Sequence, residues 1–160
     1  GLAPIAQSAF ERAAPNQLRV ARDEVKVTAA DLLRVPHGEI TEGGVRHNLR
    51  VGVQYLAAWL DGSGCVPLYN LMEDDATAEI CRTQLWEWIR HHARMDDARV
   101  LTRERCENLL GEELDDIRYR VGSEAYARGS YASAAKLFFE MVSKPELDDF
   151  LTLPAYELLP

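Results

Sequence analysis

The sequence lacks the features that mark membrane, disulfide-stabilised and nucleic-acid-binding proteins. No apolar run approaches the roughly 20 residues of a membrane-spanning helix, and no secretory signal pattern is visible. The three cysteines, Cys65, Cys81 and Cys106, are irregularly spaced, so free thiols are favoured over a disulfide framework or a zinc site. A net charge of -8 argues against a basic face for nucleic acid or an anionic membrane.

What the chain does contain is an ordinary globular composition. Of its 160 residues, 47% are hydrophobic and 28% are charged, which is enough for one domain with a core. The chain opens on Gly1 and runs straight into a helical pattern, so we expect it to be a piece of a longer protein. Residues 2–27 have little core of their own and are typical of a connecting helix or linker.

The hydrophobic pattern of the chain is helical. Apolar residues recur at helical spacing along most of the sequence, and no long alternating strand pattern is present. Capping residues and glycines divide the pattern into helices over residues 41–62, 75–95, 101–122 and 130–144. We predict an all-α fold, a helical bundle of about five main helices with short loops. The apolar tail from residue 146 onward is expected to pack on this bundle.

The most informative stretch runs from Cys65 to Ile80. Its first half predicts an extended segment and its second half predicts the start of a helix. Glu73, Asp74 and Asp75 crowd the first turn, where unpaired backbone N–H groups favour negative charge, and Asp74 or Asp75 suits the N-cap. These carboxylates either cap the helix or supply a general base. A base acting on a carbon acid also needs an electrophile, and the residues give no clear candidate.

Other candidate sites have simpler interpretations beside the chemical ones. His91 and Glu87 share a helix face and suit a metal site, but a histidine near a helix C-terminus also interacts favourably with the helix dipole. Cys65 is a candidate thiol nucleophile or an ordinary cysteine. The arginines and carboxylates of residues 103–120 balance one another, which predicts a solvent-exposed face.

Five stretches in one order along the chain resemble the malate synthases, of the shorter A-type found in bacteria and glyoxysomes. The longest, residues 64–80, reads GCVPLYNLMEDDATAEI and is similar to the C-terminal signature of that family. The other four are TEGGVRHNLRVGVQY (41–55), WEWIRHH (86–92), LGEE (110–113) and DFLTLPAY (149–156). Several long matches in order are more specific than one short motif.

This resemblance implies a fold and an activity. The family condenses glyoxylate with acetyl-CoA and water to malate and CoA, in the glyoxylate cycle. It has a (β/α)8 barrel and a C-terminal helical domain over the barrel mouth, so residues 36–160 are expected to be that domain. Residues 1–35 are expected to be the segment that leaves the barrel. Acetyl-CoA, glyoxylate and the barrel of the same protein are the implied partners, with no nucleic acid and no membrane.

The resemblance also implies roles for individual residues. The aspartate of the family's Met-Glu-Asp motif is the catalytic base, and it corresponds to Asp74. Cys65 and Met72 fall at positions expected near the thioester arm of acetyl-CoA. The arginine that stabilises the enolate and the ligands of Mg2+ belong to the barrel, so the fragment alone is expected to be inactive and to hold no metal ligands. Asp75 departs from the family, whose members usually carry a small or different residue there.

Two alternatives remain open at this point. The chain could be a non-catalytic helical protein-interaction module in which the acidic residues only cap a helix. It could also be a small metal-dependent enzyme that uses His91 and Glu87. The sequence ends Glu157-Leu158-Leu159-Pro160 without a peroxisomal Ser-Lys-Leu ending, so a cytoplasmic location is expected.

Overall fold

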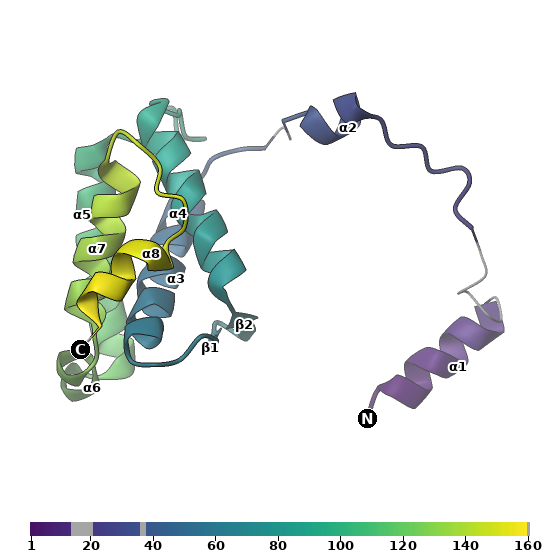
Figure 1. The fold of residues 1–160 in the computed structure, drawn as a ribbon, viewed down its shortest axis with the longest axis horizontal. Coiled ribbons are helices and arrows are strands. Elements are labelled where there is room, and N and C mark those ends of the chain that lie inside the picture. The colour runs from purple at the N-terminus through teal and green to yellow at the C-terminus, as the bar shows by residue number, and fades with distance from the viewer. Residues whose placement is uncertain (14–20, 36–37, 160) are drawn as a thin grey trace. The chain divides into compact units, whose positions relative to one another are not determined.

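The computed structural model describes residues 1–13, 21–35 and 38–159. The chain forms two compact units, residues 1–37 and residues 38–160. We call them unit 1 and unit 2, and Figure 1 shows the helices and strands of each. Residues 36 and 37, where we expected the domain to begin, lie outside the described residues.

In the residues of unit 1 that the structure describes, there are two helices and no buried side chain. Helix α1 spans Ala3–Ala13 and α2 spans Ala29–Leu33. Thr28 and Asp31 form a capping box at the start of α2, so local hydrogen bonds define this short helix. Every residue of unit 1 that the structure describes is exposed. The role that we expect for this segment, leaving a barrel, stays a prediction.

Unit 2 is a helical bundle with one small hairpin. Its long helices are α3 (Glu42–Leu60), α4 (Asp75–Arg90), α5 (Arg103–Val121) and α7 (Tyr131–Ser143). The shorter elements are β1 (Val66–Leu68), β2 (Leu71–Glu73), α6 (Ser123–Arg128), α8 (Thr152–Ala155) and the 3-10 helix η2 (Tyr156–Leu158). The predicted all-α class is therefore confirmed.

Side-chain caps set the beginnings of three long helices. Thr41, Asp74 and Thr102 each accept a hydrogen bond from the backbone N–H three residues further on. Ser130 precedes α7, but the expected cap does not form there. The Ser130 hydroxyl donates instead to Asp61 Oδ1 at 2.7 Å, which ties the start of α7 to the end of α3.

Helix α4 ends earlier than the sequence predicts. We expected it to continue to about residue 95, but it ends at Arg90. The backbone leaves the helix at His92, which has a positive φ of 50°. Met95 lies beyond the end of the helix but is still buried in the core, so its apolar side chain made the helical pattern in the sequence look longer.

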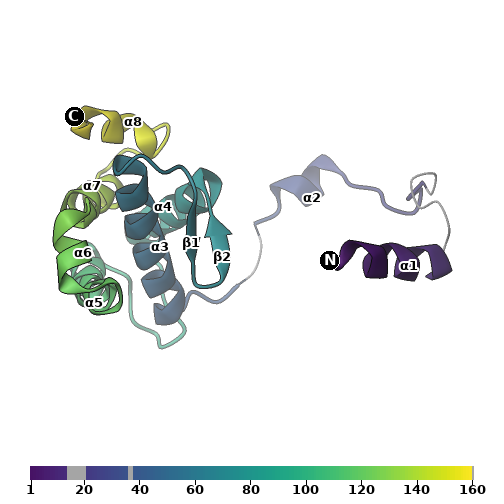
Figure 2. The ribbon, with the colours of Figure 1, turned by 90° about the horizontal axis from the view of Figure 1, so that it is seen from below.

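Helix α3 lies at the centre of unit 2. Figure 1 and Figure 2 show α4 and the hairpin on one side of it and α5 and α7 on the other, and α3 contacts α4, α5 and α7. Gly52 permits a close approach to α7, because a Cβ atom at this position would lie 2.2 Å from Phe138 Cζ. The core therefore depends on a small residue in the middle of α3.

The C-terminal tail packs on the bundle, as predicted. Leu151 and Ala155 are fully buried in the core. A fully buried Arg82 on α4 pairs with Glu79 and donates to the carbonyl of Asp148 at 3.0 Å. Glu79 Oε2 in turn accepts from the backbone N–H of Leu151 at 3.0 Å. This network holds the tail against α4, the helix that Asp74 caps.

The charged residues of α5 are less exposed than we expected, so that prediction is partly wrong. Glu113 is buried and accepts from Arg46 Nη1 on α3 at 3.0 Å. Arg105 donates to Glu42 at 2.9 Å, and these arginine contacts hold the pKa of Glu42 below its usual range, with Arg46 the largest cause. Ion pairs across α3 and α5 thus replace part of the predicted solvent-exposed face. Among the described residues, no helix has the length and apolar content to cross a membrane.

Candidate functional site

The predicted extended segment is one arm of a β-hairpin. Strands β1 and β2 pair antiparallel, with Val66 opposite Glu73, Pro67 opposite Met72 and Leu68 opposite Leu71. The two-residue turn, Tyr69 and Asn70, has φ values of 52° and 67°. Positive φ at both central positions is the geometry of a type I′ hairpin turn. The hairpin leads directly into the N-terminus of α4.

Asp74 joins the hairpin to α4 and caps the helix. Its backbone is extended, and its Oδ1 accepts from the backbone N–H of Thr77 at 3.1 Å and from the Thr77 hydroxyl at 3.3 Å. Asp74 is exposed, and Thr77 is its hydrogen-bond partner among the described residues. Oδ2 is therefore open to solvent or to a bound molecule.

The three predicted site residues share one face of the hairpin. Side chains alternate along an extended segment, and Glu73 points into unit 2 with only 4% of its surface exposed. Met72 and Asp74, on either side of it, therefore point outward. Cys65 precedes β1 at the same open end of the hairpin where Asp74 follows β2, and it is exposed. The structure thus brings Cys65, Met72 and Asp74 together.

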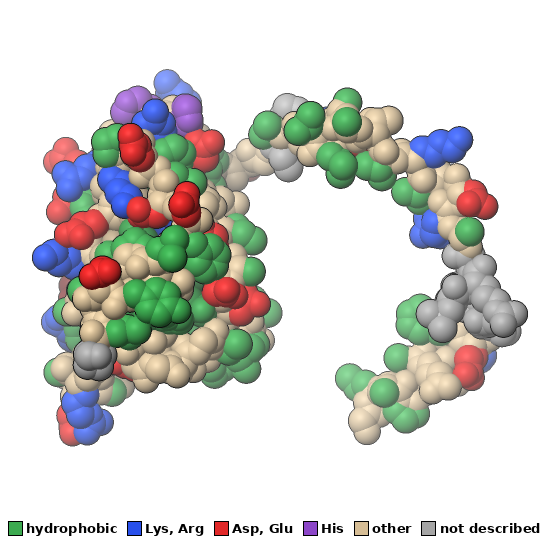
Figure 3. Space-filling model, viewed as in Figure 1, with side chains coloured by type: hydrophobic (Ala, Val, Ile, Leu, Met, Phe, Trp, Pro, Cys, Tyr) green, Lys and Arg blue, Asp and Glu red, His purple; other side chains and the backbone are tan. Residues whose placement is uncertain are grey.

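Exposed apolar side chains occur on the hairpin and the helix on either side of Asp74 in sequence. Leu71, Met72 and Ile80 are each more than half exposed. Figure 3 shows acidic and hydrophobic side chains together at the edge of unit 2 where Figure 1 draws β2 and the start of α4. Beneath them, burial raises the pKa of Tyr55 to about 12, with smaller contributions from Asp75, Cys65 and Asp74. The site is thus an apolar, negatively charged edge suited to contact with another surface.

The other candidate residues lie elsewhere. His91 Nε2 is 3.0 Å from Glu87 Oε2 in an exposed pair near the end of α4. No cluster of three or more His, Cys, Asp or Glu side chains with metal-binding geometry occurs within the described ranges. Cys81 and Cys106 are buried, and burial raises the pKa of each thiol to about 12, which disfavours the nucleophilic thiolate.

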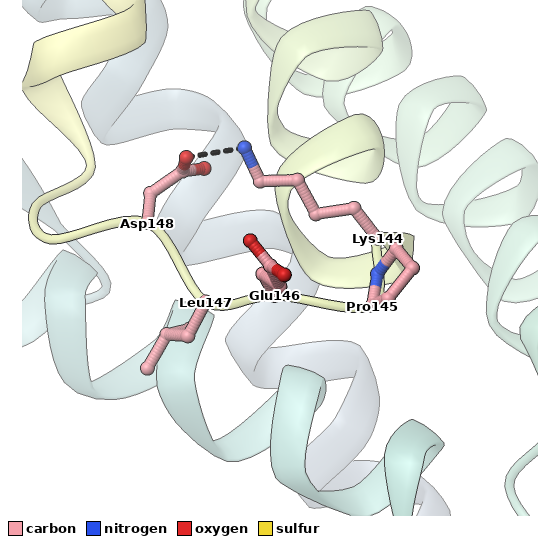
Figure 4. A pocket seen from close by; sticks show the side chains of 5 residues that line it. All are labelled: Lys144, Pro145, Glu146, Leu147 and Asp148. Carbon is pink, nitrogen blue, oxygen red and sulfur yellow. Dashed lines mark hydrogen bonds and ion pairs between the residues drawn. The ribbon is translucent and has the colours of Figure 1, made fainter.

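A small pocket lies toward the other end of α4. It is lined by residues 144–148, and Figure 4 shows the Lys144 ammonium paired with the Asp148 carboxylate. Trp86 and Arg90, in the last turns of α4, donate to the carbonyls of Lys144 and Pro145. Asp74 caps the opposite end of this 16-residue helix, so the pocket is separate from the hairpin site.

Sequence reasoning missed two residues that contact the hairpin. Gln54 donates to the Tyr69 hydroxyl, and Arg50 lies over the Tyr69 ring. The four-residue spacing of Arg50 and Gln54 indicates only that they share a face of α3. Their common partner follows Gln54 by 15 residues and belongs to another element, so no local pattern could have identified it.

Fold and site together define a helical domain that presents a single capping carboxylate on an exposed apolar edge. The comparisons with known proteins identify its family. Residues 39–159 match the family model described as "Malate synthase, C-terminal". The chain therefore belongs to the malate synthase family and corresponds to its C-terminal helical domain, which confirms the resemblance found in the sequence.

Individual relatives agree with this assignment and differ from the chain in length. The chain is 48% identical to a malate synthase of Myxococcus xanthus, 49% to one of Oryza sativa and 44% to malate synthase A of Escherichia coli. These matches cover 99% of the chain but only 30% or 31% of each relative. The chain thus spans less than a third of these relatives.

Proposed function

We propose that the complete protein to which this chain belongs condenses glyoxylate with acetyl-CoA and water to malate and CoA, and that Asp74 is its general base. The observation that carries the proposal is the position of Asp74. Its carboxylate caps α4 through Oδ1 on an exposed hairpin face, while Oδ2 accepts nothing from the described residues. A capped carboxylate is held in place, and one free oxygen is sufficient to accept a proton.

In this proposal Asp74 removes a proton from the methyl group of acetyl-CoA. The resulting enolate carbon attacks the aldehyde carbon of glyoxylate and forms the new C–C bond, and water then cleaves the thioester to release CoA. The enolate oxygen needs a positive or hydrogen-bonding partner. We expect that partner on a (β/α)8 barrel. The match covers less than a third of each relative, and the rest of their sequence is long enough for such a barrel.

Cys65 and Met72 are proposed to contact the acyl arm of acetyl-CoA. Both are exposed on the same hairpin face as Asp74. A polarisable thioether suits contact with an apolar ligand arm. Leu71, beside the hairpin turn, and Ile80, on α4, are also more than half exposed, and burial of this apolar surface under the barrel would exclude water from the carboxylate.

The described residues contain no group of three or more His, Cys, Asp or Glu side chains that could hold Mg2+. Of the two carboxylates that flank Asp74 in sequence, Glu73 points into the core and only Asp75 is exposed. We therefore expect Mg2+ to be held by the barrel, and none of the steps assigned to this chain depends on it.

A non-catalytic interaction module is the second candidate function. The observation in its favour is the cap itself, because a carboxylate at an N-cap position needs no catalytic explanation. In that case the exposed edge formed by Leu71, Met72 and Ile80 would contact a protein partner without any reaction.

The experiment that tests the proposal is an assay of free CoA thiol released from acetyl-CoA on addition of glyoxylate and Mg2+. It is run on this chain alone, on the separately produced remainder of the protein, and on the two mixed. We expect activity only from the mixture, and none when the chain carries Asp74→Asn. Release by this chain alone would contradict the division of the site between two domains.

A further inference from the structure

The tip of the β1–β2 hairpin is attached to α3 by Tyr69. Gln54 Nε2 donates to the Tyr69 hydroxyl at 2.8 Å, and the guanidinium carbon of Arg50 lies 4.8 Å from the centre of the Tyr69 ring. The same Gln54 nitrogen donates to the backbone carbonyl of Arg50 at 3.0 Å, which fixes the amide in this orientation. Two neighbouring side chains of α3 thus hold one side chain of the hairpin.

Arg50 is itself oriented from a third helix. Its Nη1 lies 3.8 Å from Oε2 of Glu113 on α5. Glu113 is buried, and its other oxygen accepts from Arg46 at 3.0 Å. The contact with Tyr69 therefore rests on a fixed group of side chains, not on a freely rotating arginine.

The turn conformation of Tyr69 indicates that its side chain matters. Its φ of 52° lies in the left-handed region, where the first position of such a turn favours Asn, Asp or Gly. A bulky residue persists in that conformation when its surroundings over-determine it, and such positions cluster at functional sites. Asn70, with a φ of 67° in the same turn, is explained by the turn alone.

We propose that Tyr69, held by Gln54 and Arg50, is a positioning residue for Asp74. This inference rests on the proposed function. A hairpin of three residue pairs is marginally stable by itself, so the hairpin moves relative to α3 once its tip is released. The backbone of Asp74 is the junction between β2 and α4 and must absorb that motion. The carboxylate then loses its alignment with the methyl proton, and such loss slows the chemical step more than it weakens binding.

Two glycine substitutions in the complete protein test this inference. Tyr69→Gly suits the turn but removes the side chain, and Asn70→Gly suits the same turn without touching the attachment. We expect Tyr69→Gly to lower kcat about 10- to 100-fold, with KM for both substrates changed less than about threefold. Deuterium uptake from D2O into the acetyl methyl group should fall in parallel with kcat. Asn70→Gly should match the unmodified enzyme in all three measurements.

A second pair of variants keeps the aromatic ring and the turn. Tyr69→Phe and Gln54→Met both remove the hydrogen bond between these side chains, and Gln54→Met also removes the bond to the Arg50 carbonyl, so the double variant should be no slower than Gln54→Met alone. Additive losses, or a Tyr69→Gly enzyme with unchanged kcat beside an inactive Asp74→Asn enzyme, would overturn the positioning role alone. Full turnover by Asp74→Asn would instead overturn the base assignment, and the positioning role with it.

Discussion

The carboxylate of Asp74 accepts two hydrogen bonds from Thr77, from its backbone nitrogen at 3.1 Å and from its hydroxyl at 3.3 Å. The proposed base is therefore also the cap of α4. Removing this side chain changes helix stability and proton transfer together. Only replacements that keep one of the two properties can separate the catalytic explanation from the structural one.

Asn is the replacement that keeps the cap of α4. It ranks with Asp as an N-cap residue, so Asp74→Asn should leave the melting temperature of the complete protein nearly unchanged. An amide cannot accept the methyl proton as a carboxylate does, so turnover should fall by at least about 100-fold. Steady-state CoA release and thermal melting of the same preparation check both expectations.

Two further variants control this result. Asp75→Asn removes the adjacent carboxylate, which bonds only to the backbone of Ala76 among the described residues, and should retain activity. Asp74→Ala removes cap and base together and should also cost about 1 kcal/mol of stability. An Asp74→Asn protein that keeps both its stability and its turnover, beside an Asp74→Ala protein that loses stability, would show that Asp74 only caps the helix.

Packing around Gly52 gives the second prediction. A methyl group there would lie 2.2 Å from Phe138 Cζ and 2.3 Å from its Cε2, and Phe138 is fully buried. Gly52→Ala should therefore lower the free energy of unfolding by about 1–3 kcal/mol through overpacking, measured by urea denaturation of this chain.

The matched control is Gly111→Ala in the exposed face of α5. A Cβ atom at Gly111 has nothing within 4 Å, so alanine gains helix propensity without a clash. This variant should be more stable by about 0.5–1 kcal/mol. Equal effects of the two substitutions would show that α3 and α7 do not approach as closely as we describe.

Several helix boundaries could be predicted from local signals, although the cap at Ser130 and the end of α4 could not. The caps at Thr41 and Thr102 and the helix end at Gly122, with a φ of 88°, follow from residues within one turn. The hairpin was read only as an extended segment. Its turn is Tyr69-Asn70, without the glycine that usually marks a two-residue turn.

The same distinction holds for the site. The acidic helix start at Asp74 was predictable because capping is local, and the family resemblance added the catalytic hypothesis. The attachment of Tyr69 to α3 and the burial of Glu113 against Arg46 depend on how α3, α5 and the hairpin pack. A charged residue on an amphipathic helix has the same local pattern whether it meets solvent or an oppositely charged partner.

The ion pair between the buried Arg82 and the partly buried Glu79 gives the third prediction. Arg82 is fully buried, and removing it leaves the Glu79 carboxylate without its cation. Arg82→Met should therefore cost about 3 kcal/mol of stability. Because Glu79 also accepts from the Leu151 N–H, the loosened tail should show faster hydrogen exchange at Leu151.

The double variant Glu79→Gln/Arg82→Met is the control for this pair. It removes both charges, so it should recover part of the stability that Arg82→Met loses. If the double variant is as unstable as the sum of the two single variants, the two side chains do not act as a pair.

The buried thiols give the last prediction, a loss of stability at alkaline pH. Burial raises the pKa of both Cys81 and Cys106 from 9.0 to about 12. Between these values the unfolded chain releases the thiol proton while the folded chain keeps it. The unfolded state then binds fewer protons, so the free energy of unfolding falls as pH rises from 9.0 toward about 12. The slope should be on the order of 1 kcal/mol per pH unit for each thiol.

Urea denaturation of this chain from about pH 8 to about pH 11 measures that slope. Cys106→Ala should be less stable at neutral pH, because it leaves a cavity in the core, yet lose stability less steeply as pH rises. Cys65→Ala, which removes an exposed thiol, is the matched control and should keep the original slope. Tyr55, with its pKa raised to about 12, contributes in the same direction in every variant, so only the difference between slopes is assigned to the thiol. Equal slopes for Cys106→Ala and the unmodified chain would contradict the raised pKa of the buried Cys106 thiol.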